Sequence, residues 1–514
     1  MDRATPGFNQ RRSQAGAGTG RSADSALPLC HRLITTHHRC VVFGPMSRLP
    51  LKIVVIDDDP TGSQTVHSCP LLLAWDVACL RRGLRHPSQL LFVLANTRAL
   101  TPGEAARRNR EIVNALAEAL TLEDIPESSI LLVSRGDSTL RGHGVLEPEV
   151  LAKEWSLRFG AIDATFHIPA FFEGGRVTRD GIHFLQDQPV HTTVFARDQL
   201  FGFSTSDLAA WLEEKSGGSI SATSVLRLKI EQLEGEEPDL VRWLEALGGN
   251  RSVVVDASRP EHLQSLGVAI RQLQGRKRFL FRSAASLLNG LADSGSEPLG
   301  PQPRDAKALT GLRRRDCSGD GLPGLVVVGS HVRLADQQIE HLLLDSRCIG
   351  VELPVARVAR ILEGGTPDLL LPDLERELQG LIKAILRSGC TPVLFTSRRE
   401  LYFGSSEAAA EQRIRFGMQL ASLMARLVRV VVPQLGYVIS KGGITTGTLL
   451  REGFALSSVD LQGQLLPGLS LVMAMVGTDH PAACSPALPV VTFPGNLGDP
   501  ETLKQAWLLM ENGV

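Results

Sequence analysis

The sequence predicts an α/β fold with two domains, each built on a mainly parallel sheet flanked by helices. From Leu51 onward, short apolar runs of strand length alternate with longer segments of helical period, which is typical of βαβ units. The chain of 514 residues is longer than one hydrophobic core usually organises. A stretch rich in Gly, Pro, Ser, Arg and Asp, residues 294–324, then separates two such series of elements and suits an exposed connection.

Strands are expected where short apolar runs end in polar or glycine-containing clusters. In the first domain these runs are Lys52 to Ile56, Leu90 to Leu94, Ile130 to Ser134, Ala161 to Ile168 and Ser252 to Val255. In the second domain they are Leu325 to Val328, Pro392 to Phe395, Tyr437 to Ser440 and Pro489 to Phe493.

One helix of the first domain has a clear start signal. Thr101-Pro102-Gly103-Glu104 predicts a capping box with proline at the first helical position. The apolar residues that follow at helical spacing are Ile112, Val113, Leu116 and Leu120.

These elements divide the chain into residues 1–50, a first domain of residues 51–293, a linker of residues 294–324 and a second domain of residues 325–514. The N-terminal extension is Arg-rich and acid-poor, and we interpret it as disordered or non-native. Its Gly16, Gly18 and Gly20 are spaced like a dinucleotide fingerprint, but no strand precedes them. A transit peptide and a start at Met46 remain alternative interpretations.

Composition narrows the class of protein. The chain has 43% hydrophobic and 21% charged residues, and 54 basic residues nearly balance 55 acidic ones. Such a balance gives no reason to expect nucleic acid or an anionic membrane as a partner. The eight cysteines are scattered without a Cys-x-x-Cys pair, so we expect reduced thiols and a cytoplasmic location. No apolar run reaches the length that a bilayer span requires.

Three polar clusters follow early strands directly. They are Asp57 to Ser63 with the sequence DDDPTGS, Asn96 to Arg98, and Arg135 to Gly142 with the sequence RGDSTLRG. Loops after parallel strands emerge at the carboxyl edge of the sheet, where ligands bind beside a switch in strand order. We therefore expect the three clusters to converge.

The residue types in these clusters suit an anionic, hydroxylated ligand. Three adjacent aspartates repel one another, so one should hold a neighbour, a metal or a hydroxyl, although a simple turn or helix cap is the alternative. Arg98, Arg135 and Arg141 offer guanidinium forks for a carboxylate or phosphate. The glycine turn from Pro169 to Arg176 either lines the same pocket or shapes it.

The second domain has three glycine loops at strand ends. Ser440 to Gly447, with the sequence SKGGITTG, follows a strand and opens a helical run, but it lacks the Walker A order. Phe493 to Gly498 and Gly329-Ser330 are the other two. Together they favour a nucleotide cradle, with ordinary glycine turns as the alternative.

Several of these motifs, in this order, resemble the four-carbon acid sugar kinase family. The matching motifs are Asp58-Asp59-Pro60-Thr61-Gly62, Asp137 to Gly142, Pro169-Ala170-Phe171 with Gly175-Arg176, and Gly442 to Thr445. The resemblance runs from about Lys52 to Gly498 and is closest to the branch with Asp-Asp-Asp-Pro-Thr-Gly. It implies a sugar-acid domain, a nucleotide domain and an active site in the cleft between them, where the γ-phosphoryl group of ATP passes to a hydroxyl of a D-threonate- or D-erythronate-like acid.

The resemblance also implies site residues by motif position. Substrate contacts would be Asp58, Asp59, Arg98, Arg135, Gly136, Asp137, Ser138, Thr139 and Arg141, of which Asp58, Asp59 and Arg141 would be catalytic. ATP contacts would be Ser330, Gly442, Gly443, Ile444, Thr445, Gly495, Asn496 and Gly498. Mg²⁺ is implied by the chemistry of phosphoryl transfer, without assigned ligands.

The chain departs from the family pattern at three places. Arg135 stands where a lysine is typical, which keeps the charge but changes the hydrogen-bond geometry. The segment from Gly329 to Ala335 lacks two of the usual hydroxyls, which puts the ATP contact of Ser330 in doubt, and Pro494 replaces a backbone donor.

Two other functions remain as alternatives. One is another α/β enzyme, such as a nicotinamide-dependent oxidoreductase or an aldolase, although no Gly-x-Gly-x-x-Gly follows the first strand. The other is a non-catalytic protein that binds a sugar acid or a nucleotide. The sequence leaves open which acid is used and whether the chain forms a homodimer.

Overall fold

The structure is a computed structural model that describes residues 51–59, 66–292, 305–364, 366–398, 407–476 and 487–513, of which residues 407–411 are described by their backbone alone. These residues belong to one compact unit, Leu49–Val514. The predicted N-terminal extension lies outside the described residues. So do Pro60 to Ser63 of the acidic cluster.

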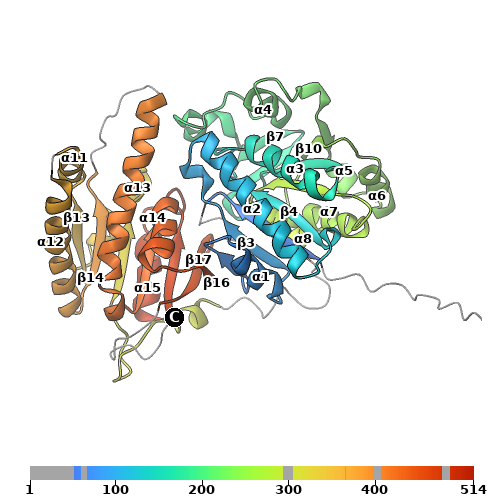
Figure 1. Cartoon of the computed structure of the whole chain (residues 1–514). Helices are drawn as coiled ribbons and strands as arrows, with labels where there is room; N and C mark the ends of the chain where they lie inside the picture. The colour runs from blue at the N-terminus through green and yellow to red at the C-terminus, as the bar shows by residue number, and fades with distance from the viewer. Residues whose placement is uncertain are drawn as a thin grey trace, which may run out of the picture. The chain divides into compact units, whose positions relative to one another are not determined.

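The first domain contains eight neighbouring parallel strands in the order β2-β3-β1-β4-β11-β5-β10-β9. Figure 1 draws this domain in blue to yellow-green. Strand β1 lies between β3 and β4, so the strand order reverses beside it, and this is where an α/β sheet opens a ligand crevice. The strands are β1 (Lys52–Asp57), β2 (Pro70–Leu72), β3 (Leu90–Leu94), β4 (Ile130–Arg135), β5 (Ala164–Ile168), β9 (Leu226–Leu228), β10 (Arg251–Val255) and β11 (Phe279–Ser283).

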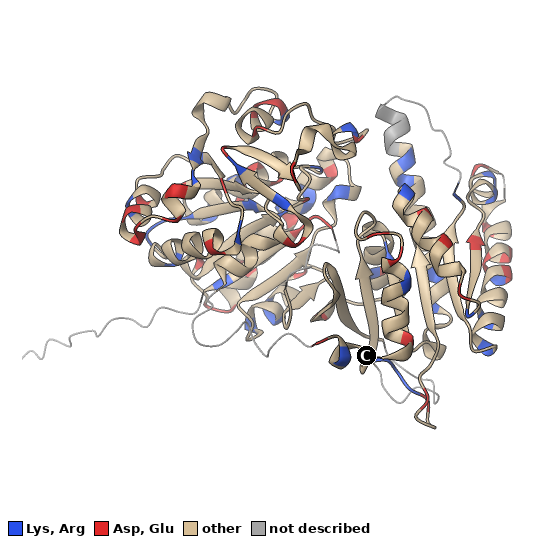
Figure 2. Ribbon diagram, turned by 180° about the vertical axis from the view of Figure 1, so that it is seen from behind, with Lys and Arg blue, Asp and Glu red and all other residues tan. Residues whose placement is uncertain are grey.

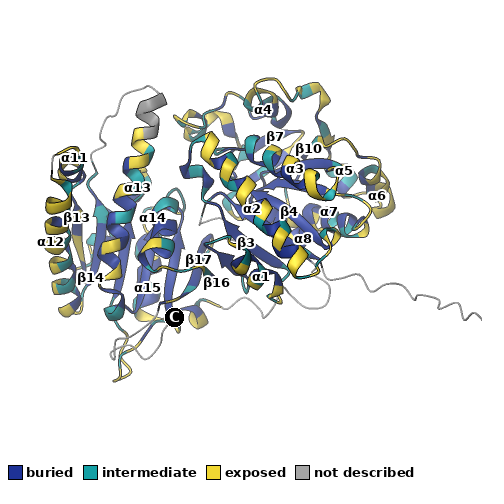
Figure 3. Ribbon diagram, in the orientation of Figure 1, coloured by how far each residue is buried: buried dark blue, intermediate teal, exposed yellow. Residues whose placement is uncertain are grey.

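Helices cover both faces of this sheet, which is why β3, β4, β5 and β11 are buried along their whole length (Figure 3). The first three helices pack on one face and α7 and α8 pack on the other. The helices of this domain are α1 (Val77–Arg85), α2 (Pro102–Leu122), α3 (Leu146–Phe159), α4 (Leu208–Lys215), α5 (Ile230–Leu233), α6 (Glu237–Glu245), α7 (Pro260–Gln272) and α8 (Ser286–Leu291).

Helix α2 confirms the predicted capping box. The Thr101 hydroxyl accepts from the Glu104 amide at 3.4 Å, and the Glu104 carboxylate accepts from the Thr101 amide at 3.1 Å. Proline occupies the first turn, and the predicted apolar stripe is buried. The loop after β3 leads directly into this helix. The cap therefore fixes the end of that loop, at the carboxyl edge of the sheet.

The second domain continues the same 15-stranded sheet in the order β13-β14-β12-β15-β18-β17-β16. Its first five strands are parallel to one another. Strand β17 runs antiparallel to β18, and β16 runs antiparallel to β17. The strands are β12 (Gly324–Val328), β13 (Cys348–Leu353), β14 (Thr391–Thr396), β15 (Tyr437–Lys441), β16 (Ser458–Leu466), β17 (Leu469–Met475) and β18 (Ala487–Phe493). The helices are α9 (Ala306–Thr310), α10 (Arg333–Leu343), α11 (Val355–Glu363), α12 (Pro367–Arg387), α13 (Glu407–Arg429), α14 (Gly443–Thr448) and α15 (Thr502–Asn512).

All nine predicted strands are confirmed within a few residues. The sequence patterns missed β2, β9, β11, β13, β16 and β17, and also a small antiparallel sheet of β6 (Arg176–Arg179), β7 (Ile182–Leu185) and β8 (Gln188–Pro189). Most of these strands are short or carry polar residues inside them, so their apolar periodicity is weak.

The two domains are joined through the sheet as well as through the chain. Strand β16 pairs antiparallel with β2, for example Val459 with Leu71, so two strand edges protect each other. Within the described part of the expected linker, Leu309 is buried in the core of the second domain. The buried Arg314 donates to the carbonyls of Val432 and Leu435 at 3.0 and 3.3 Å. This segment is therefore partly built into the second domain.

Charge is distributed over both domains. Figure 2 shows Lys and Arg interspersed with Asp and Glu on the helices and loops. None of the described helices is long and apolar enough to cross a membrane.

Candidate active site

Polar side chains from three neighbouring strands meet at the carboxyl edge of the first domain. Asp58 follows β1, Arg98 lies in the 3₁₀ turn Thr97–Ala99 after β3, and Arg135 ends β4. The structure brings these three together, as the positions of their strands led us to expect. The strand-order reversal at β1 is what places them side by side.

Arg98 is the centre of this group. Its Nη2 lies 2.7 Å from Asp58 Oδ1 and its Nε lies 3.3 Å from Asp58 Oδ2, which is a bidentate pair. Its Nη1 lies 3.4 Å from Asp59 Oδ2 and 3.8 Å from Asp137 Oδ1. Burial alone would lower the pKa of Arg98, but the three carboxylates raise it well above its ordinary value. Arg98 therefore stays charged and ties the acidic turn to the loop after β4.

Asp57 behaves differently from its two neighbours. It is fully buried, Arg135 Nη1 lies 3.7 Å from its Oδ1, and its Oδ2 has no hydrogen-bond partner among the described residues. Burial raises its pKa to about 8, with Asp58 and Asp59 adding to the rise and Arg135 opposing it. The crowding expected of three aspartates is thus relieved in two ways: Asp58 is held by Arg98, and the raised pKa of Asp57 favours its neutral form.

Sequence reasoning missed Arg282, at the end of β11. Its Nη1 donates to Ser134 Oγ at 2.9 Å and pairs with the buried Glu147, while its Nη2 lies 3.9 Å from Asp58 Oδ2. A Cβ at Gly136 would overlap the Arg282 guanidinium, so a packing need explains this glycine. The run Phe279–Ser283 is apolar and ends in Arg-Ser, so the rule that found the other clusters could have found it.

The loop after β4 carries Arg141. Its Nε lies 2.9 Å from Asp137 Oδ2, and its guanidinium lies 4.8 Å from the centre of the Phe195 ring. Asp137 also accepts from the Thr139 hydroxyl. Burial alone would raise the pKa of Asp137, but Arg141 and Arg98 hold it well below its ordinary value. Asp137 is therefore ionised and fixes the two arginines.

Two further contacts hold this loop in shape. The carbonyl of Ser138 accepts from His183 Nε2 at 2.8 Å, which ties the loop to β7. Leu140 has a φ of 66°, a conformation that costs energy for a bulky residue. Because the surroundings enforce this conformation, the loop is preorganised.

In the second domain, three glycine loops meet after β12, β15 and β18, which are adjacent strands. A Cβ at Gly442 would lie 3.3 Å from the Ser330 amide nitrogen, and one at Gly495 would lie 2.6 Å from Ser330 Oγ. A Cβ at Gly329 would overlap the Thr445 hydroxyl. Gly442 also has a φ of 114°, which L side chains rarely adopt. The loops can pack this closely only because glycines form them.

The remaining expected ATP contacts divide. Gly443, Ile444 and Thr445 form the first residues of α14, next to this junction. Asn496 follows Gly495 directly, but Gly498 is exposed and packs against Thr502 at the start of α15. The structure therefore brings Ser330, Gly442, Thr445 and Gly495 together, whereas the neighbour of Gly498 is Thr502.

Two basic residues of the second domain were not assigned a role from the sequence. Lys441 is buried at the end of β15, donates to the Pro494 carbonyl at 2.9 Å, and has its pKa lowered to about 7 by burial. Arg398 follows β14 and donates to the Ser330 carbonyl at 3.0 Å. Arg398 also forms an ion pair with Asp336, and its Nε and Nη1 have no hydrogen-bond partner among the described residues.

The acidic turn and one glycine turn approach each other. A Cβ at Gly443 would overlap the Asp59 carboxylate, which means that the turn after β1 touches the turn after β15. Across the described part of the chain, no group of three or more His, Cys, Asp or Glu could hold a metal ion.

Two family models match the chain. Residues 53–291 match a family described as the sugar-binding N-terminal domain, and residues 325–503 match one described as the nucleotide-binding C-terminal domain. No curated protein matches the chain.

Solved structures share the fold. A Salmonella typhimurium LT2 protein, provisionally described as a tRNA synthase, is 16% identical, with a TM-score of 0.58 over 89% of this chain and 98% of the other. A Haemophilus influenzae protein of the DUF1537 family is 14% identical, with a TM-score of 0.56 over 89% of this chain and all of the other. With a sugar-binding domain followed by a nucleotide-binding domain, the chain belongs to the four-carbon acid sugar kinase family.

Proposed function

We propose that this protein is an ATP-dependent kinase that phosphorylates a hydroxyl group of a small sugar acid of the threonate or erythronate type. The observation that carries the proposal is the approach of Asp59, in the sugar-binding domain, to Gly443, in the nucleotide-binding domain. A hydroxyl held by the acidic turn would then lie beside phosphates held by the glycine turn. Phosphoryl transfer needs little more than this positioning and charge neutralisation.

The two candidate aspartates differ in what they can do. Both oxygens of Asp58 face the Arg98 fork and the side chain is buried, which suits a positioning role. Asp59 is less buried and stands next to the glycine turn, so it is the better candidate for accepting the proton of the attacking hydroxyl. Arg141 and Arg135 would neutralise the substrate carboxylate and the transferring phosphoryl group.

ATP would be held by backbone amides of the loops that meet at Ser330, Gly442 and Gly495, with Arg398 as an added cation. Mg²⁺ bound to the phosphates would supply further charge neutralisation. The roles of Asn496 and Gly498 as ATP contacts remain predictions, and the exposed position of Gly498 makes it the weaker of the two.

The test is a screen of sugar acids for acid-stimulated release of ADP, followed by two variants. Asp59→Asn and Arg141→Ala should each abolish the stimulation while the melting temperature stays within a few degrees of the wild-type value. Asp239→Asn, which changes an exposed aspartate of α6 in the same domain, is the matched control and should behave as wild type. Wild-type turnover in both active-site variants would refute these assignments.

Binding without turnover is the second candidate function. The altered loop at Ser330, whose carbonyl is occupied by Arg398, favours it. If sugar acids and ATP each raise the melting temperature but no acid of the screen stimulates ADP release, the chain is a binding protein and the kinase proposal fails.

A further inference from the structure

The strand ends of the first domain carry two polar groups on opposite faces of the sheet. Registered pairing places Asp57, Arg135 and Ser283 side by side, and it places Ser134, Arg282 and His167 side by side one position earlier. Because side chains alternate along a strand, the two rows face opposite sides. The proposed catalytic residues do not account for the second row.

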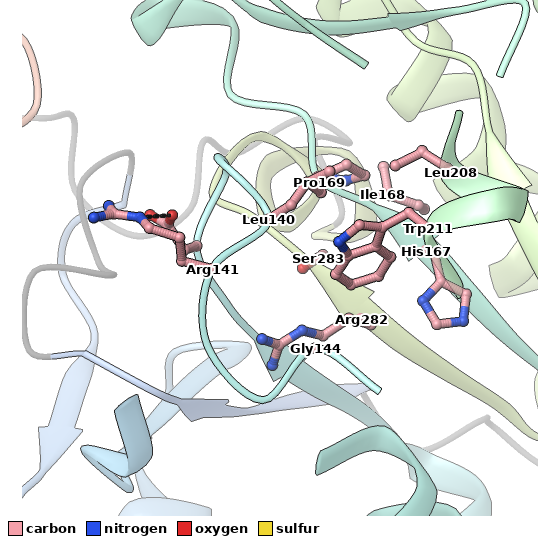
Figure 4. Close-up of a pocket in the computed structure, with 11 residues that line it drawn as sticks. Leu140, Arg141, Gly144, His167, Ile168, Pro169, Leu208, Trp211, Arg282 and Ser283 are labelled. Atoms are coloured by element: carbon pink, nitrogen blue, oxygen red, sulfur yellow. Dashed lines mark hydrogen bonds and ion pairs between the residues drawn. The ribbon is translucent and has the colours of Figure 1, made fainter. Parts of the chain in front are cut away.

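A narrow pocket lies beside this second row (Figure 4). His167 comes from β5, Trp211 from α4, and Asp137 and Arg141 from the loop after β4. Figure 4 shows the Trp211 indole between His167 and the loop that carries Arg141. The pocket has a volume of about 20 Å³, which accommodates one or two groups the size of water. All of its lining residues belong to the sugar-binding domain.

Buried polar atoms in this pocket lack partners. Among the described residues, both ring nitrogens of His167, Nε1 of Trp211 and Oγ of Ser283 have no hydrogen-bond partner, and the three residues are at most 4% exposed. Leaving a buried donor or acceptor unsatisfied costs about 1–3 kcal/mol, so such groups are rarely kept without a purpose. Three residues of this kind lining one pocket indicate a ligand that completes their hydrogen bonds.

The charges of the pocket indicate which kind of ligand fits. Arg282 is paired with Glu147, and Arg141 with Asp137, so the arginines already have carboxylate partners. Burial, with Arg282 adding, lowers the pKa of His167 to about 3, so its ring is neutral and offers one donor and one acceptor. The indole offers a donor. A neutral group that both donates and accepts suits these atoms better than a carboxylate does.

We infer that this pocket is a specificity subsite that receives one non-reacting hydroxyl of the sugar acid, bonded to His167 and Trp211. Asp137 links it to the proposed substrate site, because it lines the pocket and also lies 3.8 Å from Arg98. The inference rests on the proposed function and specifies its substrate: the acid must present a hydroxyl here besides the one that is phosphorylated. An analogue without that hydroxyl would leave two buried groups unpaired, which is a strong basis for rejection.

The experiment measures binding to the full chain by calorimetry, without nucleotide. The probes are threonate, erythronate and the corresponding 2-, 3- and 4-deoxy acids. The wild type should bind one of the deoxy acids about 10- to 100-fold more weakly than the parent acid. In Trp211→Phe and His167→Leu this ratio should fall below about 3. Trp155→Phe, at a buried tryptophan in another core cluster of the same domain, is the matched control and should keep the wild-type ratio.

Thermal stability separates a ligand role from a structural one. If the unpaired groups are kept for a ligand, removing them should leave the melting temperature of the unliganded variants equal or higher. Variants that keep the wild-type ratio, or that lose stability without changing it, would overturn the subsite and leave the kinase intact. If none of these acids binds but another acid of the ADP screen is turned over, the subsite again fails alone. If no acid binds or is turned over, the proposed function fails with it.

Discussion

The two sides of the candidate site differ in the groups that would contact a ligand. In the sugar-binding domain, side chains dominate: Arg98 alone lies within 4 Å of three carboxylates. In the nucleotide-binding domain, the loops at Ser330, Gly442 and Gly495 can approach each other because their glycines have no side chain. One side is therefore sensitive to the removal of charge, and the other to the addition of volume.

This difference follows from the ligands that each side would hold. A small acid presents a carboxylate and hydroxyls whose positions must be read one by one, which requires directed forks and hydrogen bonds. A polyphosphate can be held by backbone amides, which requires close approach of the chain and hence glycine. The comparison therefore predicts that removing a charge impairs the sugar-binding domain, and that adding a side chain impairs the nucleotide-binding domain.

The largest expected effect is that of Arg98→Ala. It removes the bidentate partner of Asp58 and leaves three carboxylates facing one another in a largely buried site. We expect a loss of about 3 kcal/mol in the free energy of unfolding and at least about 100-fold in sugar-acid-dependent kcat/KM. Urea denaturation and steady-state ADP release measure the two losses.

Arg98→Lys and Arg107→Ala sharpen this test. Lysine keeps the charge but loses the fork, so it should restore much of the stability and little of the turnover. Arg107 is an exposed arginine of α2 paired with Glu111, and its removal should change neither quantity by much. Equal stability of Arg98→Ala and Arg107→Ala would show that the charge network does not hold this side together.

Gly443→Ala should have the next largest effect, and it should act on turnover rather than on stability. The added Cβ would overlap the Asp59 carboxylate, so either the turn or the aspartate must move. We expect about a 10-fold or greater fall in kcat/KM. Gly380→Ala is the matched control, because nothing lies within 4 Å of its Cβ in helix α12, and alanine there should stabilise slightly. Wild-type kinetics for Gly443→Ala would show that turnover does not depend on the close approach of Asp59 to the turn at Gly443.

Much of the fold could be predicted because its parallel strands are continuous apolar runs. All nine expected strands are present, and so is the capped helix at Pro102–Leu122. Strands β16 and β17 could not be recognised in the sequence, because their antiparallel ladder tolerates polar residues such as Asp460 and Gln464. The pairing of β16 with β2 could not be predicted either, since a three-residue strand is too short to show a periodicity.

The site shows the same limit at the level of single residues. Arg98, Arg135 and Asp137 could be grouped because each follows a recognisable strand. Glu147 could not, because it lies in a helix and its role comes from a contact with Arg282, which is 135 positions away. The protonation of Asp57 could not be predicted either. Three adjacent aspartates look alike in sequence, and Asp57 differs from the equally buried Asp58 because it lacks a bidentate arginine partner.

The smallest expected effect concerns pH, where the two sides should respond with opposite sign. The folded-state pKa of Asp57, about 8, lies above its ordinary value of 3.8, so between these values the folded chain binds the extra proton. Its contribution to stability is therefore lost as the pH rises through about 8. The folded-state pKa of Lys441, about 7, lies below 10.5, so here the unfolded chain binds the extra proton and stability rises with pH over that interval.

Two non-titrating variants isolate these contributions. Relative to the wild type, Asp57→Asn should gain stability as the pH is raised from about 5 to 9, whereas Lys441→Met should lose it between about 7 and 10. Urea denaturation at several pH values measures both slopes, and the difference between variant and wild type cancels the other titrating groups. Parallel curves for Asp57→Asn and the wild type would mean that Asp57 is ionised in the folded state. The acidic turn would then carry three negative charges, which Arg98 and Arg135 would have to neutralise together.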